Sequence, residues 1–275
     1  MDATAHLRLL RRVAFACALA AGTPFLAPAA AQADSSLGVC RSSNLLTLSE
    51  GAGGESSPCA VGVGRFLIQT SYFQNASKVG GSALAAYPMF RVRAGLSGSL
   101  DVIIDTPSQT AYSGAGGVGL YPFSHAGAGL QYRFEQTSRF VSALDASIDA
   151  PGSRYEPVPS QPRYSLGVTS KYRIDDRWAI DTSAAAQTSE RVGFERVTPG
   201  ASVGFTFSPN ARTQVSSSIS ARLMVRRGAL QRYGDIAVTE LLSRKVAFNV
   251  GLGSAFNPVG NTKGHYLNSG FSFRP

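Results

Sequence analysis

Histidines are the first residues to consider in a search for catalytic chemistry. Downstream of residue 33 the chain has two, His125, which follows Ser124, and His265. A serine hydrolase needs a nucleophile, a general base and a group that orients the base. Serine is so common in this chain that one Ser beside one His has little significance, and no hydrolase motif accompanies the pair. We expect both histidines to be polar residues near a rim and the protein not to be an enzyme.

Metal and phosphate sites lack the residues that such sites use. Metal binding needs clustered His, Cys or carboxylate ligands, and the sequence has no such cluster. The Gly-rich stretch SGAGGVG at 113–119 lacks the Lys and the Ser or Thr of a phosphate-binding loop. We therefore expect no catalytic residue, no metal and no cofactor.

The N-terminus indicates export. Arg8, Arg11 and Arg12 precede an apolar run over 13–21, and Ala31-Gln32-Ala33 forms a small-residue cleavage pattern. The apolar run is too short for a helix that spans a membrane, which needs roughly 20 residues. Residues 1–33 are expected to be a cleaved secretory signal peptide.

Three cysteines occur in the whole chain, and Cys17 would leave with the signal peptide. Cys40 and Cys59 would remain, and in an oxidising periplasm we expect them to form a disulfide. They lie in a Ser/Gly-rich segment, 34–63, that does not share the pattern of the rest of the chain. This segment is expected either to hang in the periplasm or pack on the wall of the fold, which is the preferred reading, or to enter the lumen as a plug.

The rest of the chain reads as β-strands. Apolar and polar residues alternate with a period of two, as in half-buried strands. A pI near 9.8 and a formal charge of +9 come without a long Lys/Arg cluster, so nucleic-acid binding has no support. The expected strands cover 64–73, 88–96, 100–107, 125–134, 140–149, 163–174, 178–188, 200–207, 213–223, 235–242, 246–256 and 265–273.

The connections between these strands alternate between long and short. Tight links such as SGS at 97–99 and DDR at 175–177 follow long ones such as APGSRYEPVPSQP at 150–162. Short periplasmic turns and longer outer loops are typical of outer-membrane barrels. The sequence thus predicts an all-β fold, a closed antiparallel up-and-down transmembrane β-barrel over 64–275. We expect about 12 strands, with 10 or 14 as alternatives.

Aromatic residues gather in two expected girdles, which favours a membrane barrel over a soluble one. The band at the short turns comprises Phe134, Phe140, Tyr172, Trp178, Phe205, Phe207, Phe271 and Phe273. The band at the long loops comprises Tyr72, Phe73, Tyr87, Phe90, Tyr121, Phe123, Tyr155 and Tyr233.

The polar face of the strands is then expected to line the lumen. A three-residue SGS turn places Arg91 opposite Asp105, and the same rule places Lys171 opposite Asp181. Glu240 shares the lipid-facing parity of Val238, so the register of that strand stays open. The expected lumen-lining residues are Arg91, Arg93, Asp105, Arg133, Asp145, Lys171, Arg173, Asp181 and Arg222.

Three stretches resemble the MetA-pathway of phenol degradation family of Gram-negative outer-membrane β-barrel proteins. They are RAGLSGSLDVIIDTP at 93–107, GAGLQYRF at 127–134 and SALDASIDAPGS at 142–153, and the similarity extends over 65–275. The resemblance implies a barrel in the outer membrane that passes small, often aromatic or hydrophobic, compounds.

A second family-level feature is the C-terminal run GFSF at 270–273, followed by Arg274-Pro275. Barrels of this kind often end in an aromatic residue that the outer-membrane barrel assembly machinery recognises. The expected partners are therefore outer-membrane lipid, that machinery and a small-molecule cargo, without nucleic acid. The alternative function is a closed structural or surface-interaction barrel without an open pore.

Overall fold

The structure is a computed structural model that describes residues 39–40, 45–49, 56–77, 83–106, 109–114, 117–122, 126–150, 162–188, 197–224, 229–256 and 264–275. The chain divides into two units, 1–33 and 34–275, and every described residue belongs to the second. The expected signal peptide lies outside the described residues. Among the helices of the described part, none is long and apolar enough to cross a membrane.

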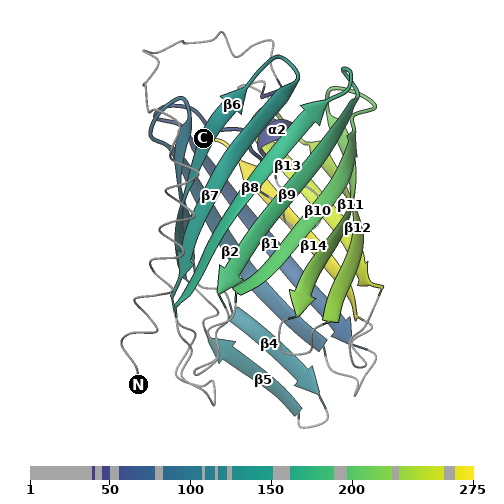
Figure 1. Ribbon diagram of the computed structural model, residues 1–275. Helices are drawn as coiled ribbons and strands as arrows, with labels where there is room; N and C mark the ends of the chain where they lie inside the picture. Colours follow the sequence, from purple (N-terminus) through teal and green to yellow (C-terminus); the bar gives the residue numbers. More distant parts are fainter. Residues whose placement is uncertain are drawn as a thin grey trace. The chain divides into compact units, whose positions relative to one another are not determined.

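The described chain is almost entirely β-structure (Figure 1). Its elements are α2 (Leu45–Leu48), β1 (Phe66–Ser77), β2 (Ala83–Gly95), β3 (Leu100–Asp105), β4 (Gln109–Gly114), β5 (Gly117–Pro122), β6 (Gly127–Gln136), β7 (Phe140–Asp149), β8 (Arg163–Arg173), β9 (Trp178–Thr188), β10 (Val197–Phe207), β11 (Thr213–Met224), β12 (Ala229–Leu241), β13 (Val246–Ala255) and β14 (Gly264–Phe273).

Twelve of the described strands form a closed antiparallel ring. The order around it is β1, β2, β3 and then β6 to β14, and β14 pairs with β1 to close the circle. Closure satisfies the backbone N–H and C=O groups of every wall strand, which a bilayer core requires because it offers no water. The predicted fold class and strand number are confirmed.

One hairpin lies outside this ring. Strands β4 and β5 pair with each other, and β4 continues the sheet beside the outer part of β2, with Leu84 opposite Tyr112. The expected strands left residues 108–124 as a long connection, so this hairpin was not predicted. The hairpin forms because β3 pairs only with the short-turn end of β2, from Arg91 to Gly95. The other end of β2 therefore has a free edge, and β4 pairs with it.

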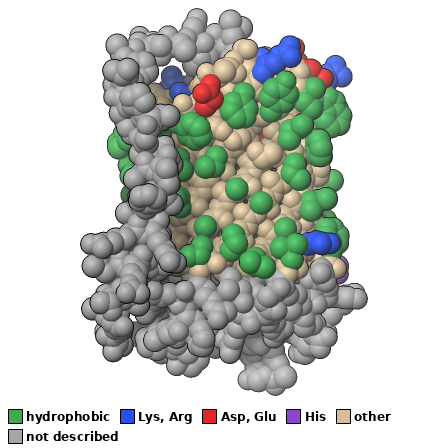
Figure 2. All heavy atoms as spheres, viewed as in Figure 1, with side chains coloured by type: hydrophobic (Ala, Val, Ile, Leu, Met, Phe, Trp, Pro, Cys, Tyr) green, Lys and Arg blue, Asp and Glu red, His purple; other side chains and the backbone are tan. Residues whose placement is uncertain are grey.

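The side chains are distributed inside out relative to a soluble barrel. Polar Arg93 and Asp101 on the inner face are 1% and 0% exposed, whereas Ile219 and Leu252 on the outer face are 60% and 59% exposed. Figure 2 shows the outward hydrophobic side chains spread over the height of the visible wall. Exposed apolar area of this extent would be costly in water, so the outer face is the lipid-facing one.

The aromatic band at the short turns is confirmed. The Trp178 and Phe207 rings lie 4.5 Å apart, and Phe140 pairs in register with Tyr172. A further pair, Phe248 and Phe271, has ring centroids 5.0 Å apart.

The expected band at the long loops is partly wrong. The Phe73 ring lies 5.7 Å from that of Tyr266, on the bore side of the wall. Tyr233 lies two residues before Asp235, whose carboxylate accepts hydrogen bonds inside the bore, so Tyr233 also faces inward. Position near a loop does not fix the face of a residue; strand parity does. Phe123 and Tyr155 lie outside the described residues.

Glu240 does face outward, as its parity requires. It lies next to Leu241, the last residue of β12, and its carboxylate accepts a hydrogen bond of 2.6 Å from Thr213 Oγ1. At the membrane edge a carboxylate reaches polar surroundings, so the register of β12 needs no slip to accommodate it.

Candidate functional site in the barrel lumen

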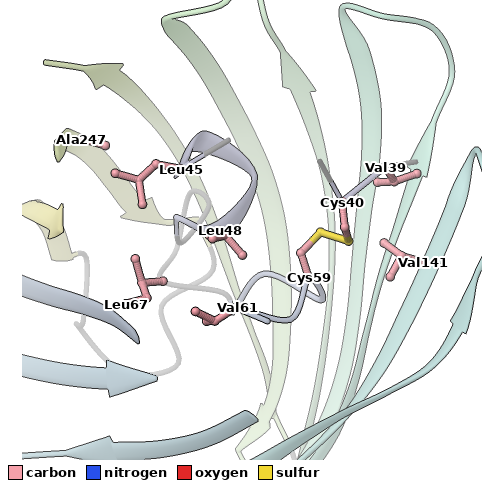
Figure 3. Packing of buried hydrophobic residues seen from close by; sticks show 9 residues of the cluster. All are labelled: Val39, Cys40, Leu45, Leu48, Cys59, Val61, Leu67, Val141 and Ala247. Carbon is pink, nitrogen blue, oxygen red and sulfur yellow. A yellow bond between two sulfur atoms is a disulfide. The ribbon is translucent and has the colours of Figure 1, made fainter. Parts of the chain in front are cut away.

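The N-terminal part of the described chain lies inside the barrel. We call residues 39–40, 45–49 and 56–63 the lumen segment. Figure 3 shows its apolar side chains and the Cys40–Cys59 disulfide beside the barrel wall. The predicted disulfide is thus confirmed. The buried cluster comprises Val39, Cys40, Leu45, Leu48, Cys59 and Val61 of the segment with Leu67, Val141 and Ala247 of the wall.

A polar contact on β2, β3 and β6 holds the lumen segment. Arg93 Nη2 donates to the Cys59 carbonyl at 2.8 Å, and Gln131 Nε2 donates to the Ser57 carbonyl at 3.0 Å. The Asp101 carboxylate accepts from the Val61 backbone N–H at 2.9 Å. These wall residues also bond to one another, because Arg93 contacts both Asp101, at 2.8 Å, and Gln131.

These three wall residues, Arg93, Asp101 and Gln131, are the docking triad. All are almost completely buried, at 1%, 0% and 2% exposure. Buried polar groups of this kind are stabilising only when their hydrogen-bonding capacity is used. The lumen segment bonds to the triad with backbone groups, and the Cys59 and Val61 side chains add apolar contacts in the buried cluster.

A second contact lies across the bore. Helix α2 packs beside β12 and β13, and Ser49 Oγ, at its end, lies 3.4 Å from Ser272 Oγ on β14. Ser49 Oγ also donates to the Leu45 carbonyl at 2.9 Å. The segment is therefore held on both sides of the short-turn half of the lumen.

A narrow crevice remains between the segment and the wall of β8 to β11. Its volume is about 30 Å³, which is room for about two water molecules. Ser49 and Ser56 to Pro58 line one side; the wall side includes Lys171, Asp181, Thr206, Gln214, Ser216 and Ser218. Hydroxyl, amide and charged side chains make up most of the lining of this crevice.

The outer half of the bore is more open and carries ion pairs across neighbouring strands. Arg91 and Asp105 are paired in register as predicted, with Nε 2.7 Å from Oδ1, and their side chains are 30% and 31% exposed. Arg163 and Asp149 form an equivalent pair at 3.0 Å. Each such pair stabilises the wall by about 0.2–1 kcal/mol.

The second predicted pair lies deeper, beside the crevice. Lys171 Nζ is 3.1 Å from Asp181 Oδ1, and Thr206 Oγ1 donates to Asp181 Oδ2 at 2.5 Å. Asp145 lies at a similar depth and accepts from Gln131 Nε2 at 2.7 Å and from Thr169 Oγ1 at 3.1 Å. Gln131 thereby connects Asp145 to the docking triad.

The remaining predicted lumen residues lie near the two mouths. Arg133 shares the inner face with Gln131 and donates to the Gly98 carbonyl at the short-turn end. Arg173 ends β8 there, 3.9 Å from Asp176. Arg222 shares its face with Ser218 on β11 but lies towards the outer mouth, where it is exposed. The predicted residues thus span the bore and do not converge on one point.

The wall opposite the docking triad is built largely of small residues. From β10 to β14 the inward positions include Gly200, Ser202, Gly204, Ser216, Ser218, Ser220, Ala237, Ala247, Gly251, Gly253, Ala255, Gly270 and Ser272. Such side chains leave space in the bore, and the lumen segment occupies part of it.

An aromatic corner interrupts this small-residue wall. Tyr266 lies over Gly253, where a Cβ atom would come within 2.1 Å of its ring. This placement lets the Tyr266 hydroxyl donate to Asp235 Oδ2 at 3.1 Å, while Ser218 Oγ donates to Oδ1 at 2.9 Å. With Phe73 beside it, Tyr266 offers an apolar ring and an acceptor to a solute in the bore.

His265 does not face the lumen. His265 is exposed and pairs in register with Ser254, two residues away from Leu252 on the outward face. His125 lies outside the described residues. Within the described ranges no group of three or more His, Cys, Asp or Glu residues could hold a metal ion.

Sequence reasoning missed Asp101 and Gln131 as functional residues. Both have the inward parity of Asp105 and Arg133, and that parity was the available signal. The sequence pattern did not indicate how deep in the bore the lumen segment would contact Asp101 and Gln131, because the segment makes these contacts with its backbone.

The chain was compared with known families and proteins. No family model matches it, and no curated relative matches either. Solved structures do match. The COG4313 outer membrane channel from Pseudomonas putida F1 has a TM-score of 0.63 at 15% identity, over 80% of this chain and 99% of that one.

Two porins are also similar in structure. The NanC porin matches with a TM-score of 0.52 at 6% identity, over 74% of this chain and 98% of the porin. The KdgM porin, in complex with disordered oligogalacturonate, matches with a TM-score of 0.50 at 8% identity, over 75% and 98%. At these identities the likeness establishes the fold, an outer-membrane-type β-barrel.

Proposed function

We propose that this protein is an outer-membrane channel for small molecules, with the lumen segment as a plug that closes it from the short-turn side. The observation that carries the proposal is that the space inside the bore is filled by a separate segment and not by the wall side chains alone. Wall side chains from β10 to β14 are mostly small, and a separate segment supplies the bulk. A barrel that serves only as a wall can fill its bore with its own large side chains.

The plug contacts suit a segment that can leave. The hydrogen bonds to the Ser57 and Cys59 carbonyls and the Val61 N–H are ones that water can replace, and the remaining contact is the apolar cluster with Leu67, Val141 and Ala247. The Cys40–Cys59 disulfide ties the two ends of the segment together, so it can move as one body.

The location and the partners belong to the same proposal. Residues 1–33 act as a cleaved signal peptide, residues 34–63 as the plug and residues 64–275 as the barrel, which the barrel assembly machinery inserts into the outer membrane. The resemblance to the MetA-pathway of phenol degradation family adds a cargo class, small aromatic or hydrophobic compounds. The aromatic corner at Phe73 and Tyr266 supports this class, because such rings stack with aromatic solutes.

The competing function is a closed structural barrel whose outer loops do the work. It is favoured by the small volume of the crevice, about 30 Å³, which leaves little free space between the described part of the segment and the wall of β8 to β11. The two functions differ in what happens when the plug is absent.

Planar-bilayer recording of the intact mature protein and of a variant lacking residues 39–61 separates them. We expect rare openings from the intact protein and steady discrete conductance from the variant. Folding of both proteins is checked by their heat-dependent migration on a gel. Silence from a folded deletion variant would leave the closed barrel as the function.

A further inference from the structure

A groove lies on the outward face of the wall, across β10 to β14. Its volume is about 570 Å³, which lies within the range of about 300–1,000 Å³ that is usual for ligand pockets. Most of its lining residues have the outward parity of Ile219, Ile236 and Leu252, and most of its exposed surface is apolar. The groove therefore opens towards lipid and not into the bore.

The groove is hollow because small outward residues lie between large ones. Ser217 pairs in register with Ile236, and Gly234 pairs with Ser254, so the middle of the groove has little side-chain bulk. The ring of Phe256 closes one end. It lies over Gly234, where a Cβ atom would clash with it, and the Phe256 side chain is 63% exposed.

The groove runs from within the wall towards the long-loop end. At one end Phe205 lies near the short turn that follows β10, whereas at the other end His265 lies near the start of β14, at the long loops. The wall strands are tilted (Figure 1), so a line of register partners across several strands changes its depth in the membrane. Because longer loops face outward in such barrels, the groove reaches the headgroups of the outer leaflet.

A cation lies on the same face near this end of the groove. Arg232 has the outward parity of Gly234 and Ile236 on β12, and its side chain is exposed. The Arg232 carbonyl accepts the Phe256 N–H at 2.9 Å, which places Arg232 beside the residue that closes the groove. A cation on the lipid face of a barrel is destabilising unless it reaches the interface, so Arg232 needs a polar or anionic partner there.

The described carboxylates of this half of the barrel do not neutralise Arg232. Asp105 and Asp149 form ion pairs inside the bore with arginines of neighbouring strands, and Asp235 accepts hydrogen bonds there. The charge that this part of the described outer face presents to lipid is therefore positive.

We infer that the groove binds an acyl chain of a phosphate-bearing lipid of the outer leaflet, with the phosphate at Arg232. An empty hollow on a lipid-facing wall loses dispersion contacts, and a hydrocarbon chain restores them. A guanidinium group pairs with phosphate oxygens in a bidentate manner. The site lies on the outside of the wall, so the inference does not depend on whether the bore conducts.

The first test measures lipid retention by the mature protein, using native mass spectrometry after extraction from vesicles of equal parts phosphatidylcholine and phosphatidic acid. The parent is expected to retain phosphatidic acid preferentially. Ser217→Leu/Ser254→Leu fills the groove and is expected to lower this retention at least tenfold. Ser269→Leu is the matched control, because Ser269 faces lipid but does not line the groove; it should retain the lipid as the parent does.

Equal retention by the parent and the filled variant would overturn the inference. A parent that carries no lipid and forms a dimer, which the filled variant does not form, would also overturn it, because the groove would then bind a second copy of the chain. Heat-dependent migration on a gel checks that each variant is a folded barrel.

The second test concerns the phosphate. Arg232→Gln is expected to lower the preference for phosphatidic acid over phosphatidylcholine about fivefold, the usual effect of a cation near a membrane surface. Arg232→Lys should keep most of the preference. Arg222→Gln removes a cation that lies near the same mouth but shares the bore-facing parity of Ser218, and it should change nothing. An unchanged preference in Arg232→Gln, or an equal loss in Arg222→Gln, would contradict the assignment of the phosphate to Arg232.

Discussion

Arg93 Nη2 lies 2.8 Å from Asp101 Oδ2 in the bore, and their side chains are 2% and 0% exposed. The two residues come from neighbouring strands, β2 and β3, and both also bind the lumen segment. In the release that we propose, the two side chains can stay paired and gain water. Release of the segment therefore leaves neither Arg93 nor Asp101 as a buried charge without its counter-ion, which would be strongly unfavourable.

Removing one partner of this pair should favour the undocked state. Asp101→Asn leaves the Arg93 charge without its counter-ion while the segment is docked, at a cost of about 3–5 kcal/mol. Undocking admits water and relieves this cost, so the docking equilibrium should shift by about 150- to 4,000-fold. Protease cleavage of the segment in the folded barrel measures the shift.

The Arg91–Asp105 pair provides a matched control for that experiment. It joins the same two strands at 2.7 Å, but its side chains are about 30% exposed, so water can reach the charge that remains when one partner is removed. Asp105→Asn should therefore leave the cleavage rate unchanged. A rate that rises equally in both variants would mean that wall stability, not docking, had been altered.

Loss of the disulfide should loosen the lumen segment and leave the stability of the barrel wall unchanged. Cys40 and Cys59 are 19 positions apart, and a loop of this size is restrained by about 3 kcal/mol in the chain-entropy account. Cys40→Ser/Cys59→Ser should loosen the segment and speed hydrogen exchange at the Val61 amide. The wall amides should keep their protection; a general loss would contradict this assignment.

The two halves of the bore should differ in access to a charged thiol reagent. Ser202 faces the bore and is partly exposed, whereas Ser216 lines the crevice and is 6% exposed. Ser202→Cys should react readily and Ser216→Cys slowly. Adding Asp101→Asn should accelerate the reaction at position 216 and leave that at 202 unchanged. Equal rates in the parent background would show that the segment does not cover the wall.

Acid should loosen one short turn before the barrel. The backbone N–H groups of Arg177 and Trp178 donate to Asp175 and lower the pKa of its carboxyl. A lowered pKa contributes stability that is present above the unfolded value and is lost as the pH falls through the folded value. Fluorescence of Trp178, the single tryptophan, should report this change.

Two substitutions test whether Asp175 causes this pH-dependent change of the Trp178 fluorescence. Asp175→Asn keeps a side-chain oxygen for the turn and should remove the pH dependence of the fluorescence. Asp176→Asn, whose parent side chain is 86% exposed, should leave it in place. A transition that persists in Asp175→Asn would belong to another group.

Much of the barrel wall could be predicted because the alternation of apolar and polar residues along a strand shows which face each side chain occupies. The alternation around Arg91 and Asp105 fixed which face is polar, and the SGS turn fixed their register. The short-turn aromatics followed from the same alternation. Phe73 and Tyr233 were misplaced because they were assigned by distance from a loop instead of by parity.

The place where the lumen segment binds could not be predicted for a different reason, although a plug was the alternative to the preferred periplasmic or wall-packed segment. The docking triad meets the carbonyls of Ser57 and Cys59 and the N–H of Val61, and every residue offers such backbone groups. No side-chain pattern in the segment therefore specified where it would bind. The β4–β5 hairpin escaped prediction similarly, because backbone pairing with β2 builds it from a Gly-rich stretch.

The most direct test of the central claim is to lock and release the plug in one protein. Ser49 Oγ and Ser272 Oγ lie 3.4 Å apart, on the segment and on β14, so Ser49→Cys/Ser272→Cys can tie the two together. In the Asp101→Asn background, bilayer recordings should be silent under oxidant and show discrete conductance after reductant. A background lacking Ser272→Cys should conduct under both conditions. Equal conductance from the doubly substituted protein under oxidant and reductant would contradict a channel closed by its own N-terminal segment.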